Sequence, residues 1–170
     1  MERFGPLRAL DASALAELMR ARAAGPNNPK ALAGYMWHGL ALAVPSPLFA
    51  LVGKFGKAFV NDPAAGTIRG WNVRMVQSRD DRWDPKLFRG RELIYGRYQL
   101  EPAADGPYPG ALRIDYGRGQ NKPWDPLQVV RDFVVEVEPG LWLGHMYLRV
   151  AARLVATPSW FALVRGERLG

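Results

Sequence analysis

The sequence contains no cysteine and only two histidines, His38 and His145, among its 170 residues. Without cysteine there are no disulfides, thiolate metal sites or cysteine nucleophiles, and the redox compartment is left undefined. A zinc centre built from several histidines is also excluded, so a metal would depend on carboxylates. We therefore expect neither a metal nor another cofactor.

Runs of consecutive basic residues are also missing, although 23 Lys and Arg against 16 Asp and Glu give a net charge of +7. A nucleic-acid-binding protein of this charge would usually gather its basic residues into a patch or a known module. Here the arginines are spaced singly, which indicates a solvated face. We expect no nucleic-acid partner; attraction of an anionic or carboxylate ligand is the functional alternative.

The first ten residues lack the basic and apolar regions of a signal peptide, so we expect a cytoplasmic protein. Between Lys30 and Lys54 lie 23 residues without a charge, a length that would span a bilayer as a helix. Pro45 and Pro47 would break that helix inside the hydrocarbon. We predict two buried or pocket-lining pieces and no membrane span.

One domain is expected over residues 1–170, with a helical N-terminal segment in residues 1–60 and an antiparallel barrel in residues 64–170. Asp11 is a good N-cap for a surface helix that ends near Arg22. Residues 30–44 and 48–52 are apolar, but such short runs do not distinguish helix from strand. Candidate strands are residues 66–77, 92–101, 111–117, 129–138, 141–150 and 160–165. Six strands separated by turn residues predict a mainly β fold, either a closed barrel or a sandwich.

Two segments resemble a bacterial family of lipocalin-like proteins that is named for a Gly-x-Trp-x-Gly motif. The first runs from Gly34-Tyr35-Met36-Trp37-His38-Gly39 through Pro47-Leu48 to Gly56-Lys57-Ala58-Phe59. The second includes Asp132-Phe133, Leu143-Gly144-His145-Met146 and Phe161-Ala162-Leu163-Val164-Arg165. Gly34 and Trp37 are separated by two residues and not by one, which departs from the motif. The resemblance implies a small antiparallel barrel with an internal cavity, and it implies no activity.

The usual catalytic motifs are absent: there is no nucleophile elbow, phosphate loop or His-Glu-x-x-His pattern. The leading candidates are His145, Tyr147 and Arg149, which share one face of a strand. Either this face is the polar part of a cavity, or it is an outer face with ordinary charges. His145, Tyr147 and the strand-centre carboxylate Asp115 are the groups that would act in acid-base catalysis if the protein is an enzyme.

Other residues are candidates for ligand binding because large aromatic and polar groups typically line such cavities. For the tryptophans, core packing is the alternative, and for Arg131, beside Asp132, it is a structural ion pair. These further candidates are Trp37, Trp71, Asn72, Tyr98, Tyr116, Arg131 and Trp160.

We hypothesise that the barrel binds a hydrophobic small molecule with an anionic or polar head. The alternatives are a barrel enzyme, a cyclase or isomerase acting on a polyketide- or terpenoid-like substrate, and a structural or interaction protein. Formation of a homodimer stays open. Residues 30–59 are expected to close one end of the barrel, where Trp37 is either a mobile plug that controls ligand entry or a rigid part of the core.

Overall fold

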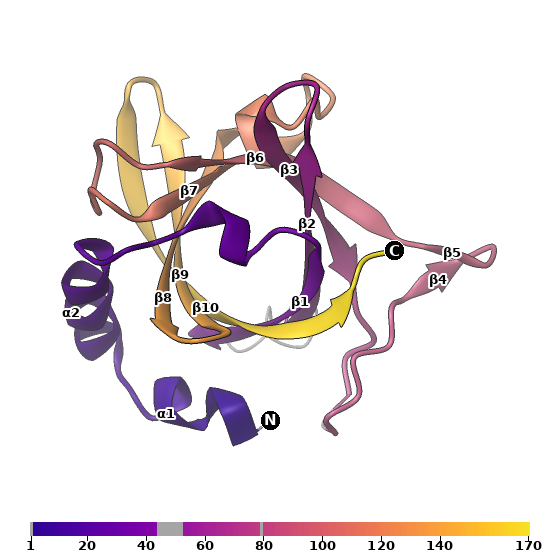
Figure 1. Cartoon of the computed structure of the whole chain (residues 1–170), viewed down its shortest axis with the longest axis horizontal. Coiled ribbons are helices and arrows are strands. Elements are labelled where there is room, and N and C mark those ends of the chain that lie inside the picture. Colours follow the sequence, from indigo (N-terminus) through magenta and orange to yellow (C-terminus); the bar gives the residue numbers. More distant parts are fainter. Residues whose placement is uncertain (1, 44–52, 79) are drawn as a thin grey trace.

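Eight strands close into an antiparallel barrel in the computed structural model, which describes residues 2–43, 53–78 and 80–170 (Figure 1). Around the barrel the order is β1-β10-β9-β8-β7-β6-β3-β2, so each strand pairs with an antiparallel neighbour on both sides. The strands are β1 (Tyr35–Ala43), β2 (Lys54–Asp62), β3 (Thr67–Arg74), β6 (Ile94–Pro102), β7 (Leu112–Asp115), β8 (Val130–Glu138), β9 (Leu141–Val150) and β10 (Arg153–Arg168). The mainly β barrel with an N-terminal helix that the sequence predicts is confirmed.

The barrel begins earlier in the chain than predicted. β1 and β2 are full members of the barrel, in a part of the sequence for which helical or irregular structure was expected. In β1, Trp37 is buried inside the barrel while its outward-facing neighbour Leu40 is buried under the N-terminal helices. A strand that is buried on both faces shows no apolar-polar alternation, which is why the pattern did not reveal it. The predicted apolar piece at residues 48–52 lies outside the described residues.

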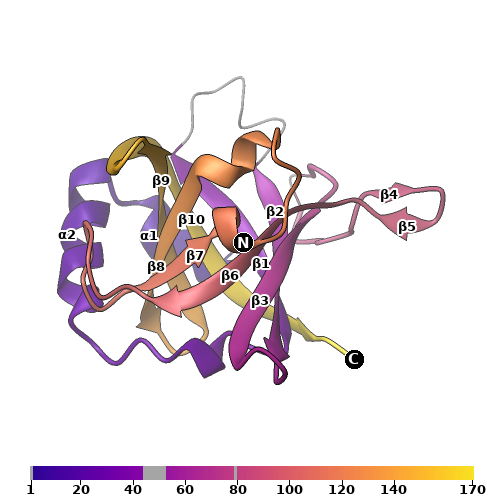
Figure 2. The ribbon, with the colours of Figure 1, turned by 90° about the horizontal axis from the view of Figure 1, so that it is seen from above.

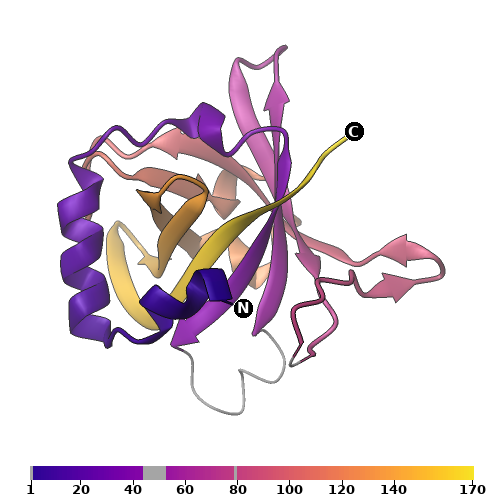
Figure 3. The same cartoon turned by 60° about the horizontal axis from the view of Figure 1, so that its bottom comes forward.

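Short helices lie on the outer wall and across one end of the barrel. They are η1 (Glu2–Phe4), α1 (Gly5–Arg8), α2 (Ala12–Ala23), η2 (Pro29–Ala31), η3 (Tyr116–Arg118) and η4 (Pro126–Val129). The predicted N-cap is confirmed, because the Asp11 carboxylate accepts a hydrogen bond from the backbone N–H of Ala14. α2 packs on the outer wall against β8 and β10, and its Leu15 and Met19 are buried in the apolar cluster of that wall. Figure 3 shows the helix beside the barrel. No helix in the described ranges combines the length and the apolar character needed to cross a membrane.

The two ends of the barrel differ. At one end η2 and the residues after it cross the opening (Figure 1), where Leu32 is fully buried and accepts a hydrogen bond from the Trp37 indole. The opposite end carries the connections from β3 to β6, from β7 to β8 and from β9 to β10. The first of these includes a separate hairpin, β4 (Leu87–Phe88) and β5 (Arg91–Glu92), which projects sideways from the barrel (Figure 2). The strand register places the site described below toward this second end.

Candidate functional site

A lysine lies inside the barrel. Lys57, in the middle of β2, is 2% exposed, and its inward direction follows from its place between the inward-facing Phe55 and Phe59. Burying an isolated ammonium group is costly, so such a group requires partners. Three elements supply these partners. Asn72 of β3 lies opposite Lys57 in the sheet register, Asp132 of β8 faces it across the barrel, and Tyr116 follows β7 directly.

All three hydrogens of the Lys57 ammonium group have acceptors. Nζ donates to Asn72 Oδ1 at 3.0 Å, to Asp132 Oδ2 at 3.1 Å and to the Tyr116 hydroxyl. The Tyr116 hydroxyl in turn donates to Asp132 Oδ2 at 3.1 Å, and the Asn72 amide donates to Tyr116 at 3.1 Å. These four residues form one connected network, which we call the Lys57 cluster.

Aromatic rings also surround the lysine. Nζ lies 4.9 Å from the ring centre of Tyr98, 5.0 Å from that of Tyr116 and 5.4 Å from that of Phe161. A cation at such distances is attracted by the ring quadrupole, and more strongly when water is excluded. Burial lowers the pKa of Lys57, and the Asp132 carboxylate opposes that shift. Burial raises the pKa of Tyr116 well above its usual range, with a further contribution from Asp132, so this phenol stays protonated.

The Lys57 cluster lies at the wall of a cavity of about 280 Å³ near the second end of the barrel. This volume is just below the range of about 300–1,000 Å³ that is typical of sites for small molecules. Apart from the cluster, the lining is mainly apolar and aromatic: Ala41, Phe55, Tyr95, Leu127, Val130, Met146, Ser159, Trp160 and Phe161. The site therefore combines a mostly apolar wall with one concentrated group of polar atoms.

Two glycines make room for the aromatic rings of this wall. A Cβ at Gly39 would lie 2.2 Å from the Phe55 ring, and a Cβ at Gly144 would lie 2.1 Å from the Phe161 ring. The two rings meet edge to face, with centroids 5.7 Å apart. Because both glycines face inward at the level of these rings, their missing side chains set the positions of Phe55 and Phe161 in the cavity.

Three of the candidate residues named from the sequence line this cavity: Asn72, Tyr116 and Trp160. Tyr98 lies beside it, and its hydroxyl donates to the backbone oxygen of Ala58 at 2.9 Å. Trp37 is fully buried against Trp142, toward the closed end of the barrel. Trp71 lies on the outer side, beside a small cluster around Met36.

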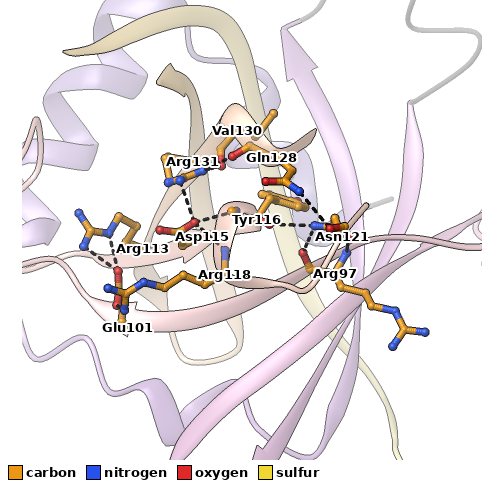
Figure 4. A network of polar contacts seen from close by, with 11 residues as sticks. Arg97, Glu101, Arg113, Asp115, Tyr116, Arg118, Asn121, Gln128, Val130 and Arg131 are labelled. Atoms are coloured by element: carbon orange, nitrogen blue, oxygen red, sulfur yellow. Dashed lines mark hydrogen bonds and ion pairs between the residues drawn. The ribbon is translucent and has the colours of Figure 1, made fainter. Parts of the chain in front are cut away.

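Four other candidates come together on the outer wall. Asp115, Arg131, Tyr147 and Arg149 line a groove of about 720 Å³ with Arg113 and Arg118. Figure 4 shows that most of these charges are paired: Arg131 contacts Asp115 at 3.0 Å, and Arg113 and Arg118 both contact Glu101 at 2.6 Å. Asp115 also caps η3 by accepting from the backbone N–H of Gly117. The acidic partners offset much of the positive charge, so the groove is a weaker candidate for an anion site than its arginines alone indicate.

His145 lies on the outer side of β9, between the barrel wall and neighbouring side chains. Its ring stacks on Trp160, with centroids 3.7 Å apart. Nε2 donates to the backbone oxygen of Thr157 at 2.9 Å, so Nδ1 is the acceptor for the Tyr108 hydroxyl at 2.9 Å. Burial lowers the pKa of His145, which favours this neutral form. Both ring nitrogens are engaged with protein groups, as expected for a histidine that holds structure together.

Sequence reasoning missed Lys57 as a site residue and treated Asp132 only as a neighbour of Arg131. The two side chains of that pair face opposite ways, because Arg131 bonds to Asp115 outside the barrel and Asp132 bonds to Lys57 inside. A signal was present: Lys57 is the single charge in residues 55–60, and Arg131 and Asp132 are the only charges in residues 129–135, where alternation places one of them on each face. Two such charges of opposite sign predict a buried pair once both segments are recognised as strands.

Within the described ranges, no group of three or more His, Asp and Glu side chains is arranged to hold a metal ion. The residues with polar side-chain atoms that line the cavity are Lys57, Asn72, Tyr95, Tyr116, Asp132, Ser159 and Trp160. Comparison with known proteins adds no relative to this picture: the chain matches no family model and no curated protein sequence.

Proposed function

We propose that the barrel binds a compact hydrophobic small molecule whose polar head contacts the Lys57 cluster. The observation that carries this proposal is the position of that cluster in the wall of a mostly apolar cavity of about 280 Å³. Ligand sites typically have this composition, with apolar walls for affinity and a few convergent polar groups for orientation. The volume favours a small or flat ligand over a long acyl chain.

The charge of the cluster favours a neutral head over an anionic one. Lys57 is already paired with Asp132 at 3.1 Å, so the cluster carries one positive and one negative group. An anion that approached Lys57 would also approach the Asp132 carboxylate and lose part of the attraction. A carbonyl or hydroxyl oxygen avoids this repulsion and can accept from the Asn72 amide or exchange hydrogen bonds with Tyr116.

Fluorescence titration tests the proposal, because Trp160 lines the cavity. We expect isoprenoid, polyketide-like or aromatic ketones and alcohols to quench tryptophan emission in a saturable manner, and fatty acids to bind more weakly. Ala41→Leu adds volume inside the cavity and should weaken binding by about tenfold or more, because overpacking costs about 1–3 kcal/mol. Ala64→Leu, in the exposed turn at the other end of the barrel, is the matched control. If no ligand class quenches, or if both variants behave alike, this cavity is not the binding site.

Catalysis is a second candidate function, favoured by the contact of Tyr116 and Lys57 with one Asp132 oxygen at the wall of the cavity. An isomerase that moves a proton next to a carbonyl needs a base and a hydrogen-bond donor to the developing oxyanion. Asp132 would take the proton, and Lys57 or Tyr116 would donate to the oxygen. Incubation with a small cyclic ketone in D2O should then introduce deuterium at the α-carbon, as measured by mass spectrometry. Incorporation that is equally fast with Asp132→Asn would exclude this role.

A further inference from the structure

The hairpin formed by β4 and β5 is an ordered projection and not part of the barrel wall. It leaves the barrel between β3 and β6 and extends sideways, as all three overall views show (Figures 1–3). Backbone hydrogen bonds fix its base, since Lys86 donates to Arg74 at 2.7 Å and Leu93 donates to Lys86 at 3.0 Å. At its turn, Arg89 and Gly90 both have positive φ, of 52° and 73°, which is the geometry of a tight two-residue hairpin turn.

Large apolar side chains on and beside this hairpin are exposed. Phe88 is 62% exposed, Leu87 is 57% exposed, and Ile94 at the start of β6 is 47% exposed. Large apolar side chains that remain in water contribute little to the stability of the fold. Leu87 and Phe88 are successive strand residues, so such side chains lie on both faces of the projecting hairpin, which makes it a candidate for contact with another apolar phase. Backbone hydrogen bonds explain the shape of this hairpin, but they do not explain why Leu87 and Phe88 are exposed.

Three basic residues and one acidic residue, Glu92 opposite Leu87, flank these apolar side chains, which leaves a net positive charge. Lys86 precedes Leu87, while Arg89 and Arg91 follow Phe88, and the Arg89 guanidinium lies 5.4 Å from the centre of the Phe88 ring. The combination of exposed leucine and phenylalanine with lysine and arginine is typical of elements that bind the interface of an anionic bilayer. The net charge of +7 on the whole chain acts in the same direction.

The hairpin belongs to the same end of the barrel as the cavity. β6 starts at Ile94 and Tyr95, directly after the hairpin, and Tyr95 lines the cavity. The connection from β7 to β8 at this end presents a second apolar and basic pair, in which Trp124 is 77% exposed and the Lys122 ammonium lies 5.6 Å from its ring. Contact with a membrane through the hairpin would therefore bring this end of the barrel close to the lipid.

We propose that the β4–β5 hairpin docks the protein onto anionic lipid bilayers, with Leu87 and Phe88 entering the interface and Lys86, Arg89 and Arg91 contacting lipid phosphates. A second copy of the chain fits the hairpin less well, because each copy carries Lys86, Arg89 and Arg91 against one Glu92, and two identical hairpins would bring like net charge together. Each of its strands has only two residues, which is too short to pair with the edge of another sheet. This inference goes beyond ligand binding and does not require it.

Vesicle flotation with the full chain tests the proposal. Wild-type protein should bind phosphatidylcholine vesicles that contain phosphatidylglycerol, and it should bind pure phosphatidylcholine vesicles weakly. Leu87→Ser with Phe88→Ser keeps every charge and should lower the partition coefficient by about tenfold or more, since it removes the apolar area that would be buried in the bilayer interface. Arg89→Asn with Arg91→Gln should lower it on anionic vesicles only; asparagine at position 89 suits the positive φ.

Leu10→Ser is the matched apolar control, because Leu10 is 37% exposed and lies between α1 and α2. Arg8→Gln on α1 is the matched charge control. Vesicle binding that survives the Leu87 and Phe88 substitutions and disappears in high salt would overturn the proposal in favour of diffuse charge attraction. A wild-type dimer in analytical ultracentrifugation that becomes monomeric with Phe88→Ser would overturn it in favour of self-association. Ligand titration of the same variants in the absence of vesicles keeps this result separate from the cavity.

Discussion

Replacement of Lys57 by methionine is the most informative perturbation of the barrel interior. Methionine has a similar length and no charge, so the substitution removes the partner of Asp132 while it preserves much of the volume. Asp132 is 4% exposed, and it would be left as a buried carboxylate with the Tyr116 hydroxyl as its remaining side-chain donor. Breaking a buried pair in this way costs about 3–5 kcal/mol, because the remaining charge is not compensated.

The double substitution Lys57→Met with Asp132→Leu should cost less than Lys57→Met alone. It removes both charges, and Tyr116 and Asn72 keep their mutual hydrogen bonds. The main remaining penalty is therefore about 1–3 kcal/mol in total for the hydrogen bonds that these two groups lose. Urea unfolding followed by tryptophan fluorescence measures each free energy of unfolding. The two residues should therefore show a coupling energy of about 2 kcal/mol or more in a double-mutant cycle.

Two results would refute this reasoning. One is a loss of less than about 1 kcal/mol for Lys57→Met, which would mean that Asp132 does not depend on the ammonium group. The other is additivity of the two substitutions, which would mean that the groups act independently. Circular dichroism of each variant should show the same strand content as the wild type, so that loss of the barrel is not mistaken for loss of the pair.

Three further predictions concern the cavity wall, the outer histidine and the closed end. Gly144→Ala should displace the Phe161 ring, lower the free energy of unfolding by about 1–3 kcal/mol and weaken ligand binding; unchanged binding in a fluorescence titration would separate this ring from the site. The lowered pKa of His145 means that the unfolded chain binds its proton at higher pH than the folded protein does, so stability should fall as the pH decreases through 6.5. Urea unfolding of His145→Gln at several pH values should show a smaller dependence, with the remainder assigned to His38, whose pKa burial also lowers. Trp37→Ala should cost about 3–5 kcal/mol and leave the rate of ligand exchange unchanged, because Trp37 is fully buried at the closed end; faster exchange in stopped-flow measurements without such a loss would instead support a mobile plug.

The barrel was predictable wherever one strand face is polar. β9 has the bounds that its sequence predicts, Leu141–Val150, because turn residues delimit it and polar residues alternate along its second half. β1 and β2 were not assigned as strands, because their outward side chains are buried too. The strand sequences did not predict that α2 covers the outer wall. A segment with apolar residues on both faces can be a buried helix as well as a strand that a helix covers.

The sequence predicted part of the candidate site, Asn72, Tyr116 and Trp160, but it did not predict which face of each strand points into the barrel. Alternation correctly separates His145, Tyr147 and Arg149 from Trp142 and Met146, but a period of two does not tell which face is inside. The structure places the first set on the outer side, where aromatic and helical neighbours bury His145 and Tyr147. Sequence patterns also did not pair Lys57 with Asp132, which are 75 positions apart and meet only when the barrel closes.

Closure of the barrel explains why the polar groups of its interior occur as one cluster. Inside a dry lumen a single buried charge must find its partners among the few side chains that face it, so one inward lysine requires an inward carboxylate at the same level. Asp132 meets that requirement from across the barrel, and the Tyr116 hydroxyl and Asn72 amide complete the hydrogen bonds of the pair. Such a cluster is a costly way to fill a core that leucine would fill more stably. Its position beside a cavity of about 280 Å³ is the reason to look there for a ligand that uses its hydrogen bonds.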